Sequence, residues 1–186
     1  MQTQSVWSRM NHAAFVTTAI VVWSLMAQAQ SAPPPTVTPA GSSPLALVGH
    51  ATRVHLAGLE DLYGIALYAP EPFDRDAIAS DDAAKALRIE VTYERDWRRP
   101  PVVWHRELVP RLEPAGAGHL YRAFAPLRRG DIVSIEYAPG RGTTVRVNRS
   151  IVVLRERHEL MLAFLDHWLG QRPVSEEVKR ALLGGS

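Results

Sequence analysis

The stretch FLDHWLGQRPVSEEVKRALLG, residues 164–184, decides the fold together with the turn YAPGRGT, residues 137–143, that precedes it. Apolar side chains recur at helical spacing up to Leu169, where a glycine follows as a helix stop. Ser175 then stands where it can cap a second helix, with two glutamates near the positive end of that helix. The C-terminal quarter therefore predicts a β-hairpin followed by two short helices, with Trp168 buried at the end of the first apolar stripe.

Upstream of these helices the sequence alternates between apolar and polar residues, which is typical of strands with one buried face. The predicted strands cover Leu45–Val48, Arg53–Leu56, Leu62–Tyr68, Leu87–Tyr93, Ile132–Tyr137, Thr143–Val147 and Ile151–Leu154. The last three form an antiparallel meander, whose second turn falls at Asn148-Arg149. Because Tyr63 and Tyr68 are five positions apart on one strand, they should face opposite sides of the sheet.

Helices are predicted from alanine-rich runs, helix-start residues and prolines. They cover Phe73–Ala86 as one or two short helices, Val102–Leu108, Leu120–Phe124, Leu160–Leu169 and the segment after Ser175. Strands in one layer and helices in another predict an α+β domain.

Residues 1–29 are predicted to be a signal peptide. An apolar run from Ala13 to Met26 precedes Ala27-Gln28-Ala29, a small-x-small cleavage signature. The mature chain should begin at Gln30 and be exported, periplasmic or secreted. The apolar run is shorter than the ~20 residues needed to span a bilayer, so no membrane span is expected after cleavage. An uncleaved anchor and a translation start at Met10 stay open as alternatives.

Composition bounds the rest of the chain. Residues 30–44 are rich in Pro, Ser and Thr and are predicted to be a flexible linker, which leaves 45–186 as one domain. A net charge of +2 with interspersed charges does not favour nucleic-acid binding. The chain has no cysteine, which excludes disulfides and thiolate metal sites. No histidine pair has metal-ligand spacing and no serine has a nucleophile motif, so neither a metal nor a cofactor is predicted.

Three blocks of this sequence resemble the chalcone isomerase-like family, in particular its bacterial, exported branch. They are LYGIALYAP at 62–70, PLRRGDIVSIEYAPGRGTTVRVN at 126–148 and HWLGQRPVSEEVKRALLG at 167–184. The resemblance implies an antiparallel β-sheet covered on one face by helices, an open-faced β-sandwich. It also implies a cleft between the sheet and the helices.

The resemblance further implies a ligand site. The family's plant enzymes close a chalcone ring by intramolecular addition, while its fatty-acid-binding relatives keep the cleft without the reaction. Both use an arginine at the cleft end of an early strand, and Arg53 matches it. A fixed guanidinium can hold a carboxylate or phenolate bidentately. Arg95 would add a second positive charge at the cleft mouth.

The sequence departs from the family's catalytic pattern. Tyr63 stands where the isomerases carry a hydroxyl-bearing Thr, and their later Tyr and Asn pair has no clear counterpart in residues 93–99. The leading hypothesis is thus a non-catalytic domain that binds a small apolar acid, fatty or aromatic, at Arg53, Tyr63 and Arg95. The alternatives are an intramolecular lyase of the chalcone isomerase type and an interaction module whose cleft is filled by its own side chains.

Overall fold

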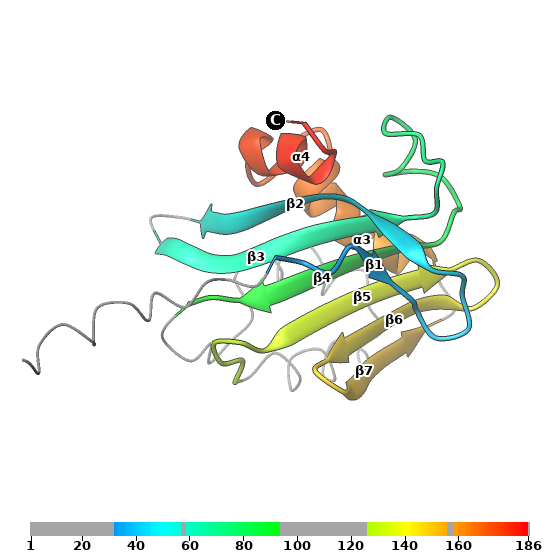
Figure 1. The fold of residues 1–186 in the computed structure, drawn as a ribbon, viewed down its shortest axis with the longest axis horizontal. Coiled ribbons are helices and arrows are strands. Elements are labelled where there is room, and N and C mark those ends of the chain that lie inside the picture. The colour runs from blue at the N-terminus through cyan, green and yellow to red at the C-terminus, as the bar shows by residue number, and fades with distance from the viewer. Residues whose placement is uncertain (1–31, 57–58, 94–125, 156–157, 186) are drawn as a thin grey trace, which may run out of the picture. The chain divides into compact units, whose positions relative to one another are not determined.

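The structure is a computed structural model that describes residues 32–56, 59–93, 126–155 and 158–185. In these residues, seven strands form one sheet in chain order, and every neighbouring pair is antiparallel (Figure 1). The strands are β1 (Thr36–Val37), β2 (Leu45–Leu56), β3 (Leu59–Ala69), β4 (Lys85–Val91), β5 (Ile132–Ala138), β6 (Gly142–Val147) and β7 (Ser150–Arg155). The helices are α3 (His158–Leu169) and α4 (Glu176–Leu182).

Both helices pack on the same face of the sheet. Leu160, Phe164 and Trp168 of α3, with Leu182 of α4, belong to one hydrophobic core. The sheet contributes alternate residues to that core, among them Ile65, Leu67, Ile89, Ile135 and Val145. The predicted α+β fold, with an antiparallel sheet covered on one face by helices, is therefore confirmed.

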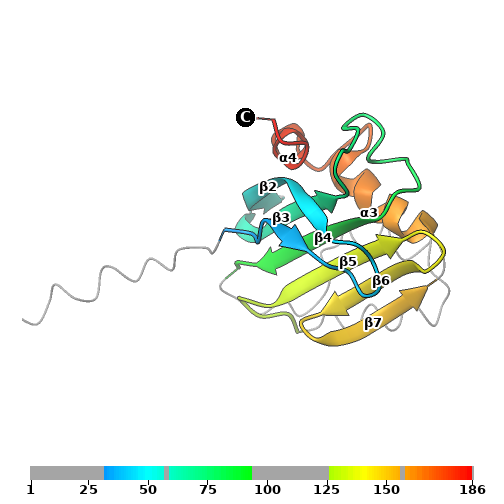
Figure 2. The ribbon, with the colours of Figure 1, turned by 45° about the vertical axis from the view of Figure 1, so that its right-hand side comes forward.

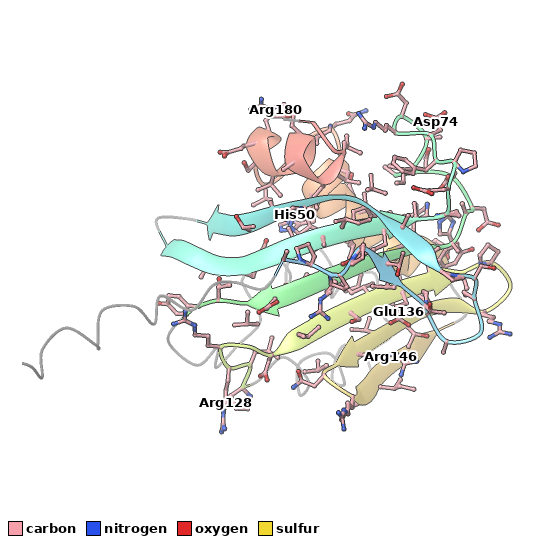
Figure 3. All side chains as sticks on the ribbon, viewed as in Figure 1. His50, Asp74, Arg128, Glu136, Arg146 and Arg180 are labelled. Atoms are coloured by element: carbon pink, nitrogen blue, oxygen red, sulfur yellow. The ribbon has the colours of Figure 1, made fainter. Side chains whose placement is uncertain are left out.

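The opposite face of the sheet is mostly polar. Glu136 of β5 and Arg146 of β6 lie there, with 3.5 Å between the carboxylate and the guanidinium Nε (Figure 3). A second, small apolar cluster occupies part of this face and consists of Leu45, Ala66, Tyr68 and Ala86. The sheet thus separates a large core from a small one.

The predicted meander and the two C-terminal helices are confirmed. Asn148 has a φ of 54°, and its side-chain oxygen accepts a hydrogen bond from the backbone nitrogen of Ile132 at 2.9 Å. Its amide nitrogen donates to the carboxylate of Asp131 at 3.0 Å, so this residue fixes the second turn. Ser175 caps α4 by accepting from the backbone nitrogen of Val178 at 3.3 Å.

Two predicted elements are wrong. Residues 45–56 form one strand with bulges instead of two strands with a turn, because β3 pairs along the whole length of β2. Residues 73–84 form turns instead of helices, and β4 begins at Lys85. The buried Lys85 explains this, since its Nζ donates to the carbonyl oxygens of Ile78 and Asp81, both at 2.8 Å, and holds the segment as turns. The helices predicted at 102–108 and 120–124 lie outside the described residues.

Part of the predicted linker packs against the sheet. Thr36–Val37 pair with the first residues of β2, and Pro39 is buried. Arg141 donates a hydrogen bond to the carbonyl oxygen of Ala40 at 3.2 Å. We call residues 35–44 the N-terminal strap. Figures 1 and 2 show β1 on the opposite side of the sheet from α3. The predicted signal peptide lies outside the described residues.

In residues 32–56, 59–93, 126–155 and 158–185, no helix is long and apolar enough to cross a bilayer.

Candidate ligand-binding site

Arg53 lies on an irregular part of β2. Ala51 is opposite Ile65, and Val54 is opposite Tyr63, so three steps along β2 match two along β3. This count places a β-bulge at Thr52–Arg53. Bulges re-aim side chains and occur often beside functional sites. The backbone of Arg53 is therefore in an unusual position, while its side chain lies outside the described part of the structure.

The bulge faces a glycine of β3. A Cβ built on Gly64 would lie 3.4 Å from the carbonyl oxygen of Thr52 and 3.5 Å from that of Ala51. The bulged backbone therefore lies within van der Waals contact of this position. The glycine of LYGIALYAP is consistent with this close approach of the two strands.

Tyr63 lies next to the bulge, on the helix-covered face. Its side chain is fully buried, and its hydroxyl accepts a hydrogen bond from Nε1 of Trp168 at 3.0 Å. The two rings meet edge to face with centroids 6.4 Å apart. Burial raises the pKa of Tyr63 well above its ordinary value, despite the bond from Trp168. The hydroxyl is thus neutral at physiological pH.

The structure brings two of the three predicted site residues close together in the backbone. Arg53 adjoins Val54, which is the register partner of Tyr63. Arg95 lies outside the described residues. Tyr68 belongs to the small cluster on the other face, as the spacing on the strand predicted.

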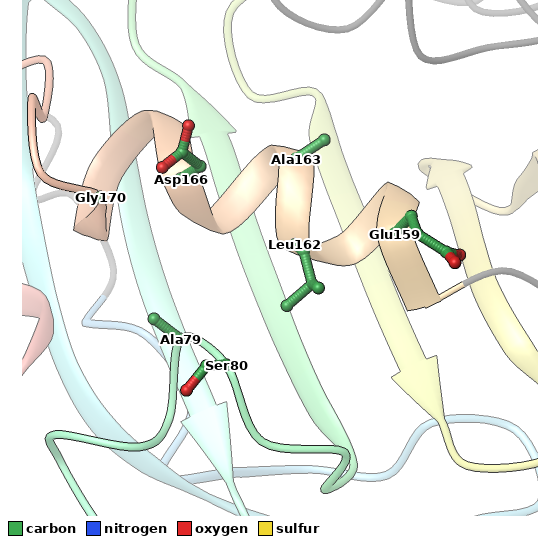
Figure 4. Close-up of a pocket in the computed structure, with 7 residues that line it drawn as sticks. All are labelled: Ala79, Ser80, Glu159, Leu162, Ala163, Asp166 and Gly170. Carbon is green, nitrogen blue, oxygen red and sulfur yellow. The ribbon is translucent and has the colours of Figure 1, made fainter.

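Two hollows among the described residues were not predicted. One has a volume of about 600 Å³ and is lined by Ala79, Ser80, Glu159, Leu162, Ala163, Asp166 and Gly170 (Figure 4). The other has about 570 Å³ and is lined by Asp82, Tyr137, Gly140, Gly142, His158 and Glu159. Tyr63 lines neither of them. No local pattern could have revealed them, because their walls come from segments far apart in the chain.

The second hollow contains a polar cluster. The Tyr137 hydroxyl donates to the Asp82 carboxylate, and the His158 ring stacks on the Tyr137 ring with centroids 4.3 Å apart. His158 Nδ1 lies 3.7 Å from Asp82. Burial, the hydrogen bond to Asp82 and the charges of Asp82 and Glu159 raise the pKa of Tyr137 to about 12. The cluster ties the segment before β4 to the sheet and to the start of α3.

No group of three or more His, Asp or Glu side chains in the described part of the chain could hold a metal ion.

The fold defines a class of protein: an antiparallel sheet covered on one face by helices, an open-faced β-sandwich. Residues 107–184 match the sequence model of the family described as chalcone isomerase-like. The crystal structure of a fatty-acid binding protein from Arabidopsis thaliana is similar, with a TM-score of 0.53 and 16% identity over 81% of this chain and 90% of that chain. No curated protein matches the sequence. The resemblance that the sequence predicts is therefore confirmed for residues 107–184, and the similar solved structure agrees with the fold.

Proposed function

We propose that this chain is an exported, non-catalytic protein that binds a small apolar acid between the sheet and the helices, with Arg53 as the anchor. The observation that carries the proposal is the β-bulge at Thr52–Arg53 beside Tyr63. The similarity in fold to a fatty-acid binding protein supports it.

Residues near the bulge suit the two halves of such a ligand. Val54, Leu62 and Val91 are buried on the helix-covered side and offer apolar walls for a hydrocarbon chain or an aromatic ring. A guanidinium at Arg53 would hold the carboxylate with two parallel hydrogen bonds. Arg95 would add a second positive charge near the same end.

The state of Tyr63 argues against catalysis at this position. A hydroxyl whose pKa is raised by burial remains protonated, so it cannot serve as a base at neutral pH. It already accepts a hydrogen bond from Trp168. The intramolecular lyase is therefore less well supported than binding.

The contact between Tyr63 and Trp168 also favours a second candidate function, an interaction module whose cleft is filled by its own side chains. Tyr63 and Trp168 are both fully buried and fill the space between β3 and α3 with their own rings. A ligand would have to lie beside this pair, nearer the bulge, or displace it.

Export rests on the predicted signal peptide, residues 1–29. The intact mass of protein from the periplasmic or secreted fraction should correspond to a chain that begins at Gln30. A mass that retains Met1 or Met10 would contradict this.

Calorimetry with a long-chain fatty acid and with cinnamic acid tests the binding function. We expect at least one acid to bind, and Arg53→Ala to weaken binding by ~2–4 kcal/mol without unfolding the protein. Arg88→Ala is the matched control, because Arg88 lies on β4 outside the helix-covered core and should leave affinity unchanged.

Each alternative has its own outcome. Turnover of a hydroxylated chalcone that Arg53→Ala abolishes would replace binding with the lyase. No heat from either acid with wild-type protein would favour the interaction module.

A further inference from the structure

A groove runs along the side of α3 that faces away from Tyr63. Its helix residues stand three, four, seven and eleven positions after Glu159, so they lie along one side of the helix: Glu159, Leu162, Ala163, Asp166 and Gly170. Ala79 and Ser80 form the facing wall, and Figure 4 shows Leu162 directed toward it. The centre of the groove is apolar. We call it the α3 groove.

The wall formed by Ala79 and Ser80 is fixed by contacts of the residues beside it. Ile78 is buried in the main core, and its carbonyl oxygen accepts from Lys85 Nζ at 2.8 Å. The carboxylate of Asp81 pairs with the same ammonium. The backbone nitrogen of Ser80 also donates to the carbonyl oxygen of Ala77 at 2.8 Å. A wall that is already ordered reduces the entropy lost when a partner binds.

Glu159 extends the groove into the second hollow. It lines both the apolar hollow and the polar one that contains Asp82, Tyr137 and His158. From Glu159 to Gly170 the helix rises ~16 Å at ~1.5 Å per residue. An extended peptide at ~3.3 Å per residue would cover this length with about five residues.

The Asp and Glu side chains described in the two hollows carry negative charge. Among the described residues, neither Lys nor Arg lines either hollow, whereas Asp82 and Glu159 present carboxylates. The whole chain, by contrast, has a net charge of +2. Complementary charge would steer a cationic partner to the groove.

We propose that the α3 groove binds an extended segment of a partner protein. The segment would place an apolar side chain against Leu162 and Ala79, and a Lys or Arg beside Glu159 and Asp82. This site is distinct from the proposed acid site, because its carboxylates would repel an acid and it lies on the other side of α3. A peptide fits better than a small molecule, because both hollows are open along one side and could cover only one face of a ligand.

Chemical-shift mapping of the ¹⁵N-labelled protein with a blocked hexapeptide, acetyl-Leu-Ala-Leu-Lys-Gly-Lys-amide, tests the proposal. We expect the largest shifts at the amides of Ser80, Glu159 and Leu162, and weaker binding at higher salt. A second peptide with glutamate in place of both lysines should not bind. Shifts that are scattered, absent, or equal for the acidic peptide would overturn the proposal.

A pair of charge reversals sharpens the test by fluorescence polarisation of the labelled peptide. Glu159→Lys should weaken binding about tenfold, since it replaces an attraction with a repulsion. Glu177→Lys is the matched control, because Glu177 is an exposed glutamate in the first turn of α4 and lines neither hollow. Equal effects of the two variants would overturn the proposal. Because neither residue belongs to the proposed acid site, acid binding at Arg53 can succeed or fail independently.

Discussion

Tyr63 and Tyr68 lie on the same strand, and both side chains are fully buried, but they are buried in different ways. Tyr63 packs under α3, and its hydroxyl accepts a hydrogen bond from Trp168. Tyr68 packs on the other face, where its hydroxyl has no hydrogen-bond partner among the described residues. The two faces of the sheet are therefore covered differently: a helix supplies a polar partner for Tyr63, and no described residue supplies one for Tyr68.

The helices α3 and α4 cover one face of the sheet, whereas the N-terminal strap covers only the small cluster on the other face. Val37 of the N-terminal strap packs on the small cluster that includes Tyr68 and Leu45. A layer of helices can supply polar partners from side chains such as Trp168, whereas a short strap offers mainly apolar contact. The energetic effect of a substitution should therefore depend on which face it alters.

Trp168→Ala should have the largest effect on the free energy of unfolding. It removes a large, fully buried side chain from the main core, and such changes cost ~3–5 kcal/mol. Denaturant unfolding measures it, with Ile151→Ala as a control because Ile151 is an exposed apolar residue. A loss below ~1 kcal/mol would mean that α3 does not close this face.

Deleting residues 32–42 should have the next largest effect. It removes β1 and uncovers the cluster around Tyr68, which at ~25 cal/mol per Å² corresponds to ~2–3 kcal/mol for roughly 100 Å² of apolar surface. Thermal or denaturant unfolding of the shortened and full chains gives the difference. An unchanged stability would restore the prediction of a flexible linker.

Tyr63→Phe should cost ~1–2 kcal/mol. The change keeps the ring but removes the hydroxyl that accepts from Trp168, and a buried donor then loses this acceptor. Unfolding in urea measures the loss. No loss in this variant would show that the hydrogen bond does not distinguish the two faces.

Much of the fold could be predicted because its signals are local. The meander follows from alternation and from a turn in which Asn148 adopts positive φ, and α4 follows from the cap at Ser175. The turns at 73–84 could not be predicted, because alanines and aspartates favour a helix until the buried Lys85 is taken into account. The sequence around Gly49 favours a turn, but pairing with β3 keeps β2 continuous there.

The candidate site was only partly predictable. Arg53 was identified through a family resemblance, and only the structure shows that it lies at a bulge in β2. Its ligand and the role of Arg95 stay predictions. The α3 groove gave no signal, because Leu162 and Glu159 lie on the side of a helix that reads as solvated, and only the tertiary fold brings Ala79 opposite them.

Tyr68→Phe should have the smallest effect at neutral pH and the opposite sign from Tyr63→Phe. Removing a buried hydroxyl that has no hydrogen-bond partner avoids its desolvation cost, so stability should be unchanged or rise by up to ~1 kcal/mol. The advantage should grow above pH ~10, the ordinary pKa of tyrosine. Burial raises the pKa of Tyr68 in the folded protein, so the unfolded chain releases the proton first and wild-type stability falls as the pH rises. Phe has no such proton. Urea unfolding of both proteins at pH 7 and pH 10.5 measures the two differences, and a loss of stability in the variant at neutral pH would show that the Tyr68 hydroxyl has a partner after all.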